Sequence, residues 1–537
     1  MSEFLSKRLA LIDDSSINKD DAPPMRKMGR HMSSHGFQRA LIRHGGGDPH
    51  IIKAFLPSVP LRESVPQWES LFIGDPNLGP FATERLWGDS RRYSLIGITH
   101  TLSTPAPLRV LADLPQAPLH HWDALICTSA AALAAVETLW DHCEELCRCR
   151  GGKPAPRPQL PLIPLGINAA DFSPLCSRSD ARRRLKLSDN AFVVLWTGRL
   201  ELHCKAHHGA TFRALAHAAA ACPERPWVLL MYGTAVMPSI PPALKEAAAA
   251  LCPAVEVRLL NGHDLNLGAL ARAASDAFLS LVDCLQETFG LTPIEAMASR
   301  LPVVASDWNG YRDTVVEGRT GFRIPTQSFE PGWSDLQLEQ LARTDTALDR
   351  VSARISGQIG VDAVAAGQAL ARLAASPELA VAMGCLGEQR VREHYDWSVV
   401  LQRYSELLDD LLERRQLAMA DTSLARLASN RPTPALAQIF AAWPSHTINA
   451  QTTIKPSGNA ADLHHHLQLL MVRIYSRELP PPELILKTFQ HLEKMGTSNL
   501  HQLQYLSKPD LSANEAAQLP EAVGWLLKHG FAEVAAP

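Results

Sequence analysis

The sequence predicts an α/β protein made of two consecutive α/β units and a mainly helical C-terminal extension. Short, continuous apolar runs alternate with helical patterns through most of the chain. This alternation is typical of parallel sheets that are covered by helices, and strands buried on both faces are expected to be apolar throughout. The predicted strands are Leu95–Thr99, Ala124–Cys127, Val193–Trp196, Val228–Met231, Val255–Leu260, Ala277–Leu281 and Val303–Ala305.

A change of pattern and several loop-like segments set the expected domain boundaries. Segment 148–160 is rich in glycine and proline and precedes a connector that ends the first unit. From about 361 to 424 the apolar residues follow a helical period. We therefore expect domains at 1–170, 171–428 and 429–537, the last of them helical and without a recognisable catalytic motif.

Composition narrows the class of protein. The 537 residues include 52 basic and 55 acidic side chains, a formal net charge of -3, which argues against a general nucleic-acid binder. No apolar run approaches the length that a membrane helix needs, and the acidic N-terminal segment does not resemble a signal peptide. On these two grounds we expect a cytoplasmic protein. Its ten cysteines are scattered and suggest no disulfide framework.

The segment from Thr292 to Glu295 predicts the start of a helix. Thr292 can act as the N-cap, Pro293 suits the first helical position, and Glu295 would complete a capping box. The preceding loop, Glu287 to Leu291, would then lie at a helix N-terminus, where free N–H groups and the helix dipole favour phosphate. Gly290 would let the backbone come close to a ligand. The alternative is that Glu295 only caps the helix and Glu287 is a solvated loop residue.

The ordered series in residues 285–325 resembles the retaining glycosyltransferases of family 4 (glycosyl transferases group 1), which have the GT-B fold. The family typically shows Glu, Phe-Gly-Leu, Glu-Ala-Met-Ala, Pro-Val-Val-Ala and Thr-Gly in this order, and each stands in this chain. One departure is Arg300, where the family usually has glycine. The resemblance covers about residues 90–420 and implies two Rossmann-like lobes that face each other across a cleft.

The same resemblance extends upstream to Gly198-Arg199 and to Lys205. In the family, an arginine and a lysine after this strand grip the diphosphate of the donor, and such cations stabilise the charge that develops as the diphosphate leaves. The spacing between Arg199 and Lys205 is six, where five is commoner, so Arg199 is the better match. The alternative is a pair of solvated surface cations.

The resemblance also implies the roles of the other positions. Glu295 would bind the ribose hydroxyls, Glu287 the transferred sugar, and the loop after residue 260 the base. His100 would approach the sugar from the first lobe. The implied catalytic residues are His100, Arg199, Lys205 and Glu287, and the implied donor-binding residues are Gly198, Asn261, Gly262, His263, Thr288, Phe289, Gly290, Leu291 and Glu295.

The implied reaction moves a sugar from a nucleotide-diphosphate sugar to a saccharide, a lipid-linked or another acceptor, with retention of the anomeric configuration. No Asp-x-Asp pair occurs in the chain, so we expect no metal and no cofactor beyond the donor. The same analogy suggests peripheral contact with the inner face of a membrane. Two other classes remain open: a nucleotide-sugar epimerase or phosphorylase on the same fold, and a catalytically silent scaffold.

Overall fold

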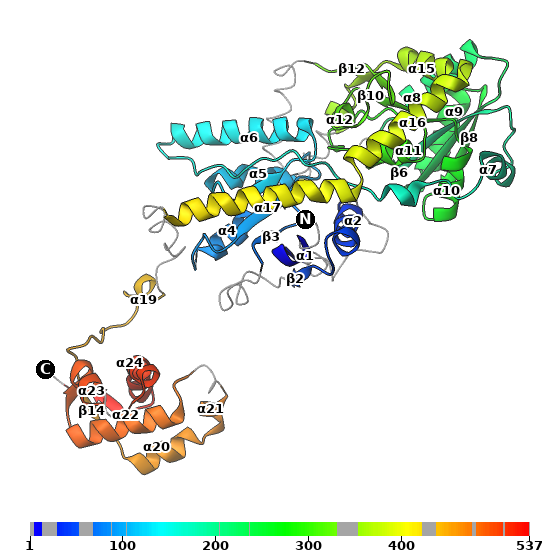
Figure 1. Ribbon diagram of the computed structural model, residues 1–537. Coiled ribbons are helices and arrows are strands. Elements are labelled where there is room, and N and C mark those ends of the chain that lie inside the picture. Colours follow the sequence, from blue (N-terminus) through cyan, green and yellow to red (C-terminus); the bar gives the residue numbers. More distant parts are fainter. Residues whose placement is uncertain are drawn as a thin grey trace. The chain divides into compact units, whose positions relative to one another are not determined.

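The computed structural model describes residues 5–12, 29–52, 68–86, 88–103, 105–202, 205–235, 237–329, 353–420, 436–474, 479–507 and 511–535. The chain separates into two compact units, residues 1–432 and 433–537. The first unit contains two parallel sheets, one in each lobe (Figure 1). This arrangement confirms the predicted α/β class with two lobes.

The first lobe is a five-stranded parallel sheet with the order β2-β1-β3-β4-β5. Helices α4, α5 and α6 cover one face of the sheet, and α2 packs on the other. The strands are β1 (Leu9–Ile12), β2 (His50–Ile52), β3 (Ser70–Phe72), β4 (Ser94–Ile98) and β5 (Ala124–Ile126). The helices are α1 (Leu5–Arg8), α2 (Gly29–His44), α4 (Gly79–Arg85), α5 (Pro105–Asp113) and α6 (Ala130–Cys149).

The second lobe is a six-stranded parallel sheet with the order β11-β10-β9-β6-β7-β8. Helices α8, α9 and α15 cover one face, and α7, α10 and α11 cover the other. The strands are β6 (Phe192–Leu200), β7 (Trp227–Ala235), β8 (Val255–Asn261), β9 (Ala277–Ser280), β10 (Val303–Ser306) and β11 (Gly321–Ile324). The helices are α7 (Arg178–Arg184), α8 (Gly209–Ala221), α9 (Ile240–Leu251), α10 (Leu265–Ala274), α11 (Leu291–Ala298), α12 (Tyr311–Thr314), α15 (Ala363–Ala375) and α16 (Pro377–His394).

The strand order of the second lobe reverses between β6 and β9. Strands β6 to β8 proceed outward on one side, and β9 to β11 proceed outward on the other. In open parallel sheets a ligand binds beyond the carboxyl ends of the strands at such a reversal. We therefore expect a ligand site at the loops that follow β6 and β9.

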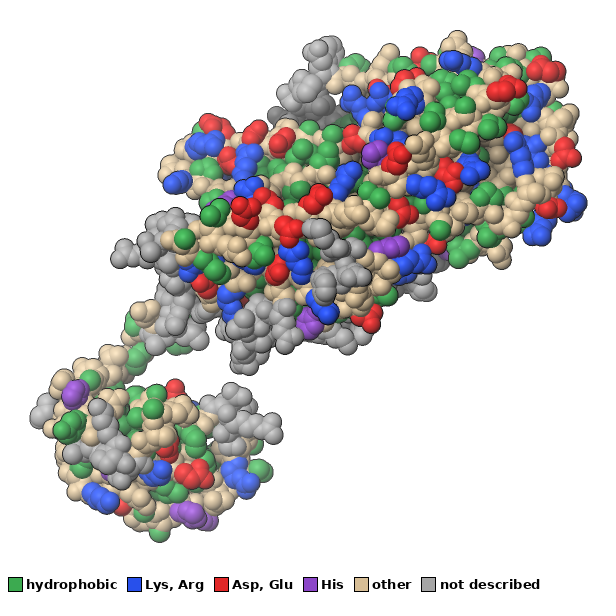
Figure 2. Space-filling view, viewed as in Figure 1, with side chains coloured by type: hydrophobic (Ala, Val, Ile, Leu, Met, Phe, Trp, Pro, Cys, Tyr) green, Lys and Arg blue, Asp and Glu red, His purple; other side chains and the backbone are tan. Residues whose placement is uncertain are grey.

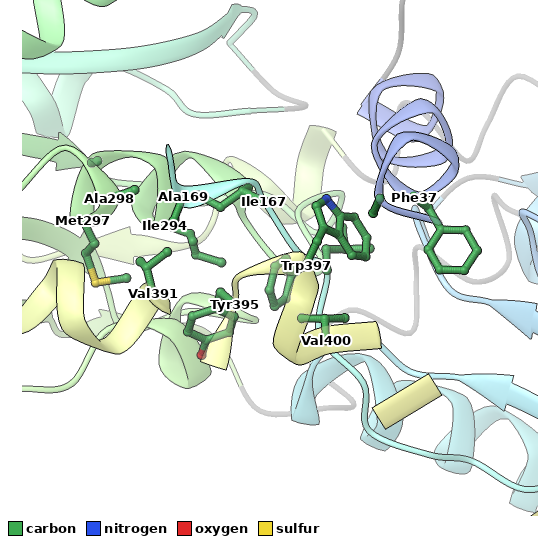
Figure 3. Close-up of a cluster of buried hydrophobic side chains, with 14 of the residues drawn as sticks. Phe37, Ile167, Ala169, Ile294, Met297, Ala298, Val391, Tyr395, Trp397 and Val400 are labelled. Carbon is green, nitrogen blue, oxygen red and sulfur yellow. The ribbon is translucent and has the colours of Figure 1, made fainter. Parts of the chain in front are cut away.

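Two chain segments that cross between the lobes are paired with each other. The Ile167 N–H donates to the Tyr395 carbonyl at 2.9 Å, and the Trp397 N–H donates to the Ile167 carbonyl at 3.0 Å. Gly166 is required here, because a Cβ at this position would lie 2.6 Å from the Trp397 ring. Figure 3 shows Trp397 in the apolar cluster that joins the two lobes, with Phe37 on one side and Val391 on the other.

Helix α17 (Trp397–Ala420) follows this crossing and packs on the first lobe, where Tyr404 contacts Phe37 and Phe72 (Figure 1). The domain boundary expected at residue 428 grouped this helix with the second lobe. In the structure the apolar stripe of α17 shares one core cluster with α2 and the first sheet.

All seven predicted strands are confirmed. Strands β6 and β7 run further than predicted, to Leu200 and Ala235, because they remain paired with each other beyond their apolar stretch. The capping box at Thr292 is wrong. Helix α11 begins at Leu291, and its N-cap is Gly290 in the left-handed region with φ 92°. A glycine N-cap turns the chain into the helix earlier than a threonine at 292 would, so Glu295 lies beyond the first turn.

The second unit is mainly helical around a small antiparallel sheet with the order β15-β14-β16. Its core contains Phe489 and Trp525. The strands are β14 (Thr453–Pro456), β15 (Ser498–Asn499) and β16 (Ala532–Val534), and the helices are α19 (Leu436–Ile439), α20 (Ala460–Leu467), α21 (Leu470–Arg473), α22 (Pro482–Met495), α23 (Leu500–Ser507) and α24 (Ala513–Lys528). The helical content was predicted from the sequence, and the sheet was not.

Among the described helices none is by itself long and apolar enough to cross a membrane. Helices α15 and α16 together would pass by length and composition, but the pair is bent by 105°.

Candidate functional site

An ion pair between Lys205 and Glu287 lies where the strand order of the second sheet reverses. Lys205 is in the loop after β6, and Glu287 is in the loop after β9. Both side chains are mostly buried, with 15% and 16% of their surface exposed. Burial by itself would lower the pKa of Lys205, but the Glu287 carboxylate outweighs it and the pKa is raised. The lysine is therefore a fixed positive charge at neutral pH.

Gly198 makes room for the aliphatic stem of Lys205. Its φ is 153°, and a Cβ at this position would lie 3.1 Å from Lys205 Cε and from the Trp196 ring. Two further glycines, Gly233 and Gly262, continue this contact across the ends of β7 and β8, and the Gly262 N–H donates to the Gly233 carbonyl at 3.0 Å. Side chains at these positions would push the three loops apart.

Gly290 shapes the start of α11. Its φ of 92° is unfavourable for any residue with a Cβ, and a Cβ there would overlap the ring of Tyr311. Tyr311 is fully buried and forms a 2.9 Å hydrogen bond with Ser280 through its hydroxyl. Among the described residues the N–H groups of Gly290 and Leu291 have no hydrogen-bond partner. Unpaired amides at a helix N-terminus are the groups that bind phosphate oxygens.

Glu295 lies in the middle of α11 and is partly buried, and its side chain forms no hydrogen bond within the described part of the chain. Burial raises the pKa of its carboxyl group, and the positive charges of Arg272 and Lys205 oppose that effect. Tyr232 is part of the same group, because burial raises its pKa and Arg272 lowers it. Its hydroxyl donates to the Gly262 carbonyl at 3.0 Å. Arg272 thus influences the protonation of both Glu295 and Tyr232.

Arg199 differs from Lys205 in its surroundings. Its side chain is 43% exposed and pairs with Glu201 at 3.0 Å. It lies in β6 directly after Gly198 and forms no ion pair with Glu287. The sequence favoured Arg199 over Lys205 on spacing, whereas burial and the Glu287 pair favour Lys205.

The two lobes touch beside this site. The hydroxyl of Ser129, the N-cap of α6 in the first lobe, donates to the Thr288 carbonyl at 2.5 Å. The Ala130 N–H donates to the Asp313 carboxylate at 2.7 Å. A carboxylate at a helix N-terminus is stabilised by the free amides and the helix dipole. Helix α6 therefore holds the loop that carries Glu287 against the first lobe.

A cavity of about 310 Å³ lies at this contact. Ala131 lines it from the first lobe, and Glu287, Trp308 and Asn309 line it from the second. Trp308 is held in place by a 2.9 Å hydrogen bond from its Nε1 to the Cys284 carbonyl. Glu287 therefore lines a cavity between the lobes, where a bound substrate could contact residues of both lobes.

The remaining predicted positions lie further apart. His100 follows β4 in the first lobe and forms a 3.1 Å hydrogen bond with the Gly74 carbonyl. Asn261 and His263 are exposed at the end of β8, where the Asn261 side chain accepts the His263 N–H at 3.0 Å. The side chain of Phe289 is buried, so only its backbone is available to a ligand.

Several residues of the site were not identified from the sequence. Tyr232 and Arg272 join Glu295, Tyr311 closes over Gly290, and Ser129 reaches across from the first lobe. Tyr311 could have been proposed as a site residue from the sequence, because it follows the polar turn that comes after a predicted strand. Among the described residues no group of three His, Cys, Asp or Glu side chains is placed to hold a metal ion.

Comparison with known proteins identifies the second lobe. Residues 191–336 match the family model of the glycosyl transferases group 1. A D-inositol 3-phosphate glycosyltransferase of Streptomyces avermitilis is 30% identical over 257 residues, 45% of this chain and 50% of that protein. The chain thus spans about half the length of this curated relative. A stretch of 35 residues is 63% identical to the lipopolysaccharide core biosynthesis mannosyltransferase LpcC of Rhizobium leguminosarum bv. viciae, 6% of this chain and 10% of that protein.

Solved structures support the fold. A glycosyltransferase from Rickettsia africae aligns with a TM-score of 0.52 at 13% identity, over 75% of this chain and 98% of that chain. Residues 191–336 of the second lobe therefore match the glycosyl transferases group 1 family, and the two lobes have the GT-B fold.

Proposed function

We propose that this protein transfers a glycosyl group from a nucleotide-diphosphate sugar to an acceptor hydroxyl, with retention of the anomeric configuration. The observation that carries the proposal is the buried Lys205–Glu287 pair beside the free N–H groups of Gly290 and Leu291. The pair lies at the strand-order reversal of a glycosyl transferases group 1 domain. A cation and amides fixed in advance are suited to the charge of a departing diphosphate.

The proposed step breaks the bond between the anomeric carbon and the β-phosphate oxygen, and the electron pair stays on the phosphate. The acceptor oxygen forms its bond to the anomeric carbon on the same face, and its proton passes to the leaving phosphate oxygen. Lys205 and the α11 amides would bind the diphosphate in this step. No side-chain base and no metal is then required.

Glu287 has two roles in this proposal. In the free protein it balances the charge of Lys205. A bound diphosphate would compete for the lysine, and the carboxylate would then turn to the sugar hydroxyls in the 310 Å³ cavity between the lobes. Arg199 would add a more exposed cation at the diphosphate. His100 would meet the sugar from the first lobe.

The nucleoside would lie along α11. Glu295 would bind the ribose hydroxyls, and the positive charge of Arg272 would favour its carboxylate form. Asn261, Gly262 and His263 would contact the base through their backbone groups at the end of β8. This placement leaves the base unspecified, because backbone groups can pair with several bases.

The acceptor would be a saccharide, a lipid-linked glycan or a related alcohol. The relatives named above make an inositol phosphate and a lipopolysaccharide core oligosaccharide the first two to test. Peripheral binding to the inner face of a membrane would bring the enzyme to a lipid-linked acceptor.

The test is a panel of nucleotide sugars, incubated with and without these acceptors, with nucleotide release and product configuration measured by NMR. We expect release that depends on an acceptor and an axial or equatorial product bond matching that of the donor. Interconversion of the sugar without an acceptor would instead support an epimerase. Protein that binds no nucleotide in a thermal-shift screen would support the silent scaffold, and an inverted product would overturn retention.

A further inference from the structure

A second cavity, of about 560 Å³, lies at the opposite end of the second sheet from the Lys205–Glu287 pair. Phe192 at the start of β6, Asp276 before β9 and Pro302 before β10 line it, so it is at the amino ends of the strands. The donor groups lie at the carboxyl ends of the same sheet. The cavity is therefore separate from the site described above.

The lining of this cavity is positively charged. Four arginines, Arg178, Arg182, Arg225 and Arg300, face two aspartates, Asp189 and Asp276. Glu388, outside the lining, pairs with Arg300, which leaves one positive charge more than these three acids balance. Figure 2 shows Lys and Arg side chains gathered over the part of the second lobe where α7 lies. An uncompensated group of arginines in a concave site favours an anion.

One carboxylate serves two of the arginines. Asp276 pairs with both Arg178 and Arg182, and its Oδ2 also accepts the Val193 N–H at 2.7 Å. Arg182 is buried, and it uses its other donors on the carbonyls of Ala274 and Asp189, so its role is structural. Arg178 is 49% exposed and has no other acid within the described residues. Burial, followed by the charges of Arg182 and Arg225, lowers its pKa to about 10.

Arg225 is held in place without being neutralised. It donates to the Ala374 carbonyl at 2.7 Å and to the Asn190 carbonyl at 3.4 Å, and its guanidinium lies over the Phe192 ring. Carbonyls satisfy hydrogen bonds but carry no charge, and no described carboxylate pairs with it. Its Nη2 has no hydrogen-bond acceptor in the described part of the chain. The structure therefore fixes a cation with a spare donor at the cavity.

Arg300 occupies a backbone conformation that favours glycine. Its φ is 59°, directly after the C-terminal end of α11, and a side chain in this region is strained. Helix α16 can pack against the Arg300 carbonyl because residue 384 is a glycine. A Cβ on Gly384 would overlap the carbonyl oxygen of Arg300. The guanidinium pairs with Glu388 through Nε, and its two Nη groups have no acceptor among the residues that the structure describes. Glu388 is shared with Arg392.

We propose that this cavity binds a small phosphate monoester. Arg178, Arg225 and Arg300 would contact the phosphate, since each offers donors or charge that the protein leaves unused, and arginine binds phosphate through paired N–H groups. Pro377, the first residue of the 18-residue helix α16, also lines the cavity, so the positive end of that helix dipole lies beside it.

The cavity also has an apolar wall, to which Phe192, Leu301, Leu373 and Val381 contribute. A phosphate alone would leave this wall unused, and the volume is in the range of sites for small organic ligands. The ligand is therefore an organic phosphate. It could be free in solution or the headgroup of a lipid, and the chemistry of recognition is the same for both.

The test measures binding of ribose 5-phosphate to the full-length protein by isothermal titration calorimetry. The double variant Arg178→Ala/Arg300→Gly should bind it at least about tenfold more weakly, because two of the three phosphate contacts are lost. Both replaced side chains are largely exposed, and glycine suits the φ of residue 300, so the variant should fold. Far-UV circular dichroism and a thermal melt check this.

Two control variants make the result specific. Arg183→Ala removes an arginine of the same helix, 77% exposed and paired with Asp180, that does not line the cavity; it should bind ribose 5-phosphate within about twofold of wild type. Lys205→Met removes the cation of the donor site and should also leave this binding intact. Weakening in Lys205→Met but not in the double variant would place the phosphate at the donor site and overturn the proposal.

A vesicle arm separates the two sources of phosphate. Phosphatidylcholine vesicles with and without phosphatidic acid are sedimented with wild type and with the double variant. If the protein sediments with the vesicles only when phosphatidic acid and both arginines are present, the site binds a lipid headgroup. If only saturable binding of ribose 5-phosphate is observed, the site binds a soluble ligand. No binding in either arm, or equal binding by the double variant, overturns the proposal. None of these measurements depends on glycosyl transfer, so the two proposals can fail separately.

Discussion

The two ends of the second sheet handle charge in opposite ways. At the carboxyl ends, Lys205 and Glu287 are mostly buried and balance each other one for one. At the amino ends, four arginines face two aspartates, and Arg178 and Arg300 are about half exposed. The first arrangement is suited to positioning one charge in a fixed direction with little water nearby. The second is suited to attracting an anion from solution.

The two ends of α11 repeat this contrast in the backbone. Gly290 before the helix and Arg300 after it both have left-handed φ, 92° and 59°. At Gly290 the ring of Tyr311 occupies the space where a side chain would be. At Arg300 the chain tolerates the strain and keeps a long cationic side chain. The surroundings therefore decide whether a residue with positive φ can carry a side chain. Tyr311 excludes a side chain at residue 290, whereas residue 300 carries one.

The largest effect that would test this contrast is on stability at Gly290. Gly290→Ala should lower the free energy of unfolding by roughly 2–5 kcal/mol, because left-handed strain and overlap with Tyr311 add. Urea denaturation measures it. The control is Gly318→Ala, where φ is also positive at 68° but no atom lies within 4 Å of the new Cβ. This control should lose only about 1 kcal/mol, and equal losses would remove the role assigned to Tyr311.

The next effect is on catalysis and compares a buried cation with an exposed one. Lys205→Met should lower kcat of glycosyl transfer by roughly 10²–10³-fold, the usual loss when one preorganised charge-stabilising group is removed. Arg199→Ala should lower it by less than about tenfold, since that side chain is 43% exposed and paired with Glu201. Steady-state kinetics with saturating donor measure kcat for both variants and show which loss is larger. A larger loss for Arg199 would restore the order that motif spacing indicates.

Asp283, just beyond β9, allows a test by pH. Burial raises the pKa of its carboxyl group to about 7, although the His207 N–H bonds lower it. Between about pH 4 and pH 7 the folded protein therefore holds a proton that the unfolded chain has lost, and stability falls as pH rises through this window. The stabilisation that comes from the protonated Asp283 carboxyl group is fully present below the pKa of the unfolded chain and is lost above the pKa of the folded protein.

Asp283→Asn should remove this dependence. By about pH 8 the variant should exceed wild type in free energy of unfolding by roughly 2–4 kcal/mol relative to their difference at about pH 4. Urea denaturation across this range measures the two curves. Parallel curves for the variant and wild type would show that the carboxyl group does not titrate in this window.

The smallest effect is at Arg300. Arg300→Gly should change the free energy of unfolding by less than about 1 kcal/mol, because relief of the left-handed strain offsets the loss of an exposed ion pair with Glu388 and the greater freedom of glycine when unfolded. Thermal and urea unfolding measure it. A loss well above this value would mean that the arginine stabilises the fold, and its strained position would then need no ligand to explain it.

The strands were predictable because buried parallel strands are continuous apolar runs. Residues such as Val193–Trp196 and Val303–Ala305 carry that pattern whatever packs against them. The site loop was predictable in part, since Gly290 and the carboxylates at 287 and 295 follow a motif in order. The start of α11 was mispredicted because Thr292, Pro293 and Glu295 fit a capping box locally, while the tertiary contact with Tyr311 favours an earlier start at Gly290.

The roles of the two cations show why the rest could not be predicted. Arg199 and Lys205 are both positive residues after one strand, and spacing favoured the arginine. Only the fold brings Glu287, 82 residues away, against Lys205 and leaves Arg199 beside Glu201. The hydrogen bond of Ser129 with Thr288 likewise joins segments that no local pattern relates.

Local sequence patterns predicted the strands of the two parallel sheets, because strands buried on both faces are continuous apolar runs. The tertiary structure decided which cation is buried and paired, where α17 packs, and that arginines from α7, the loop before β7 and the end of α11 meet in one cavity. The physical reason is that burial and charge pairing depend on distances through space, which residues far apart in the chain acquire only when the sheets close.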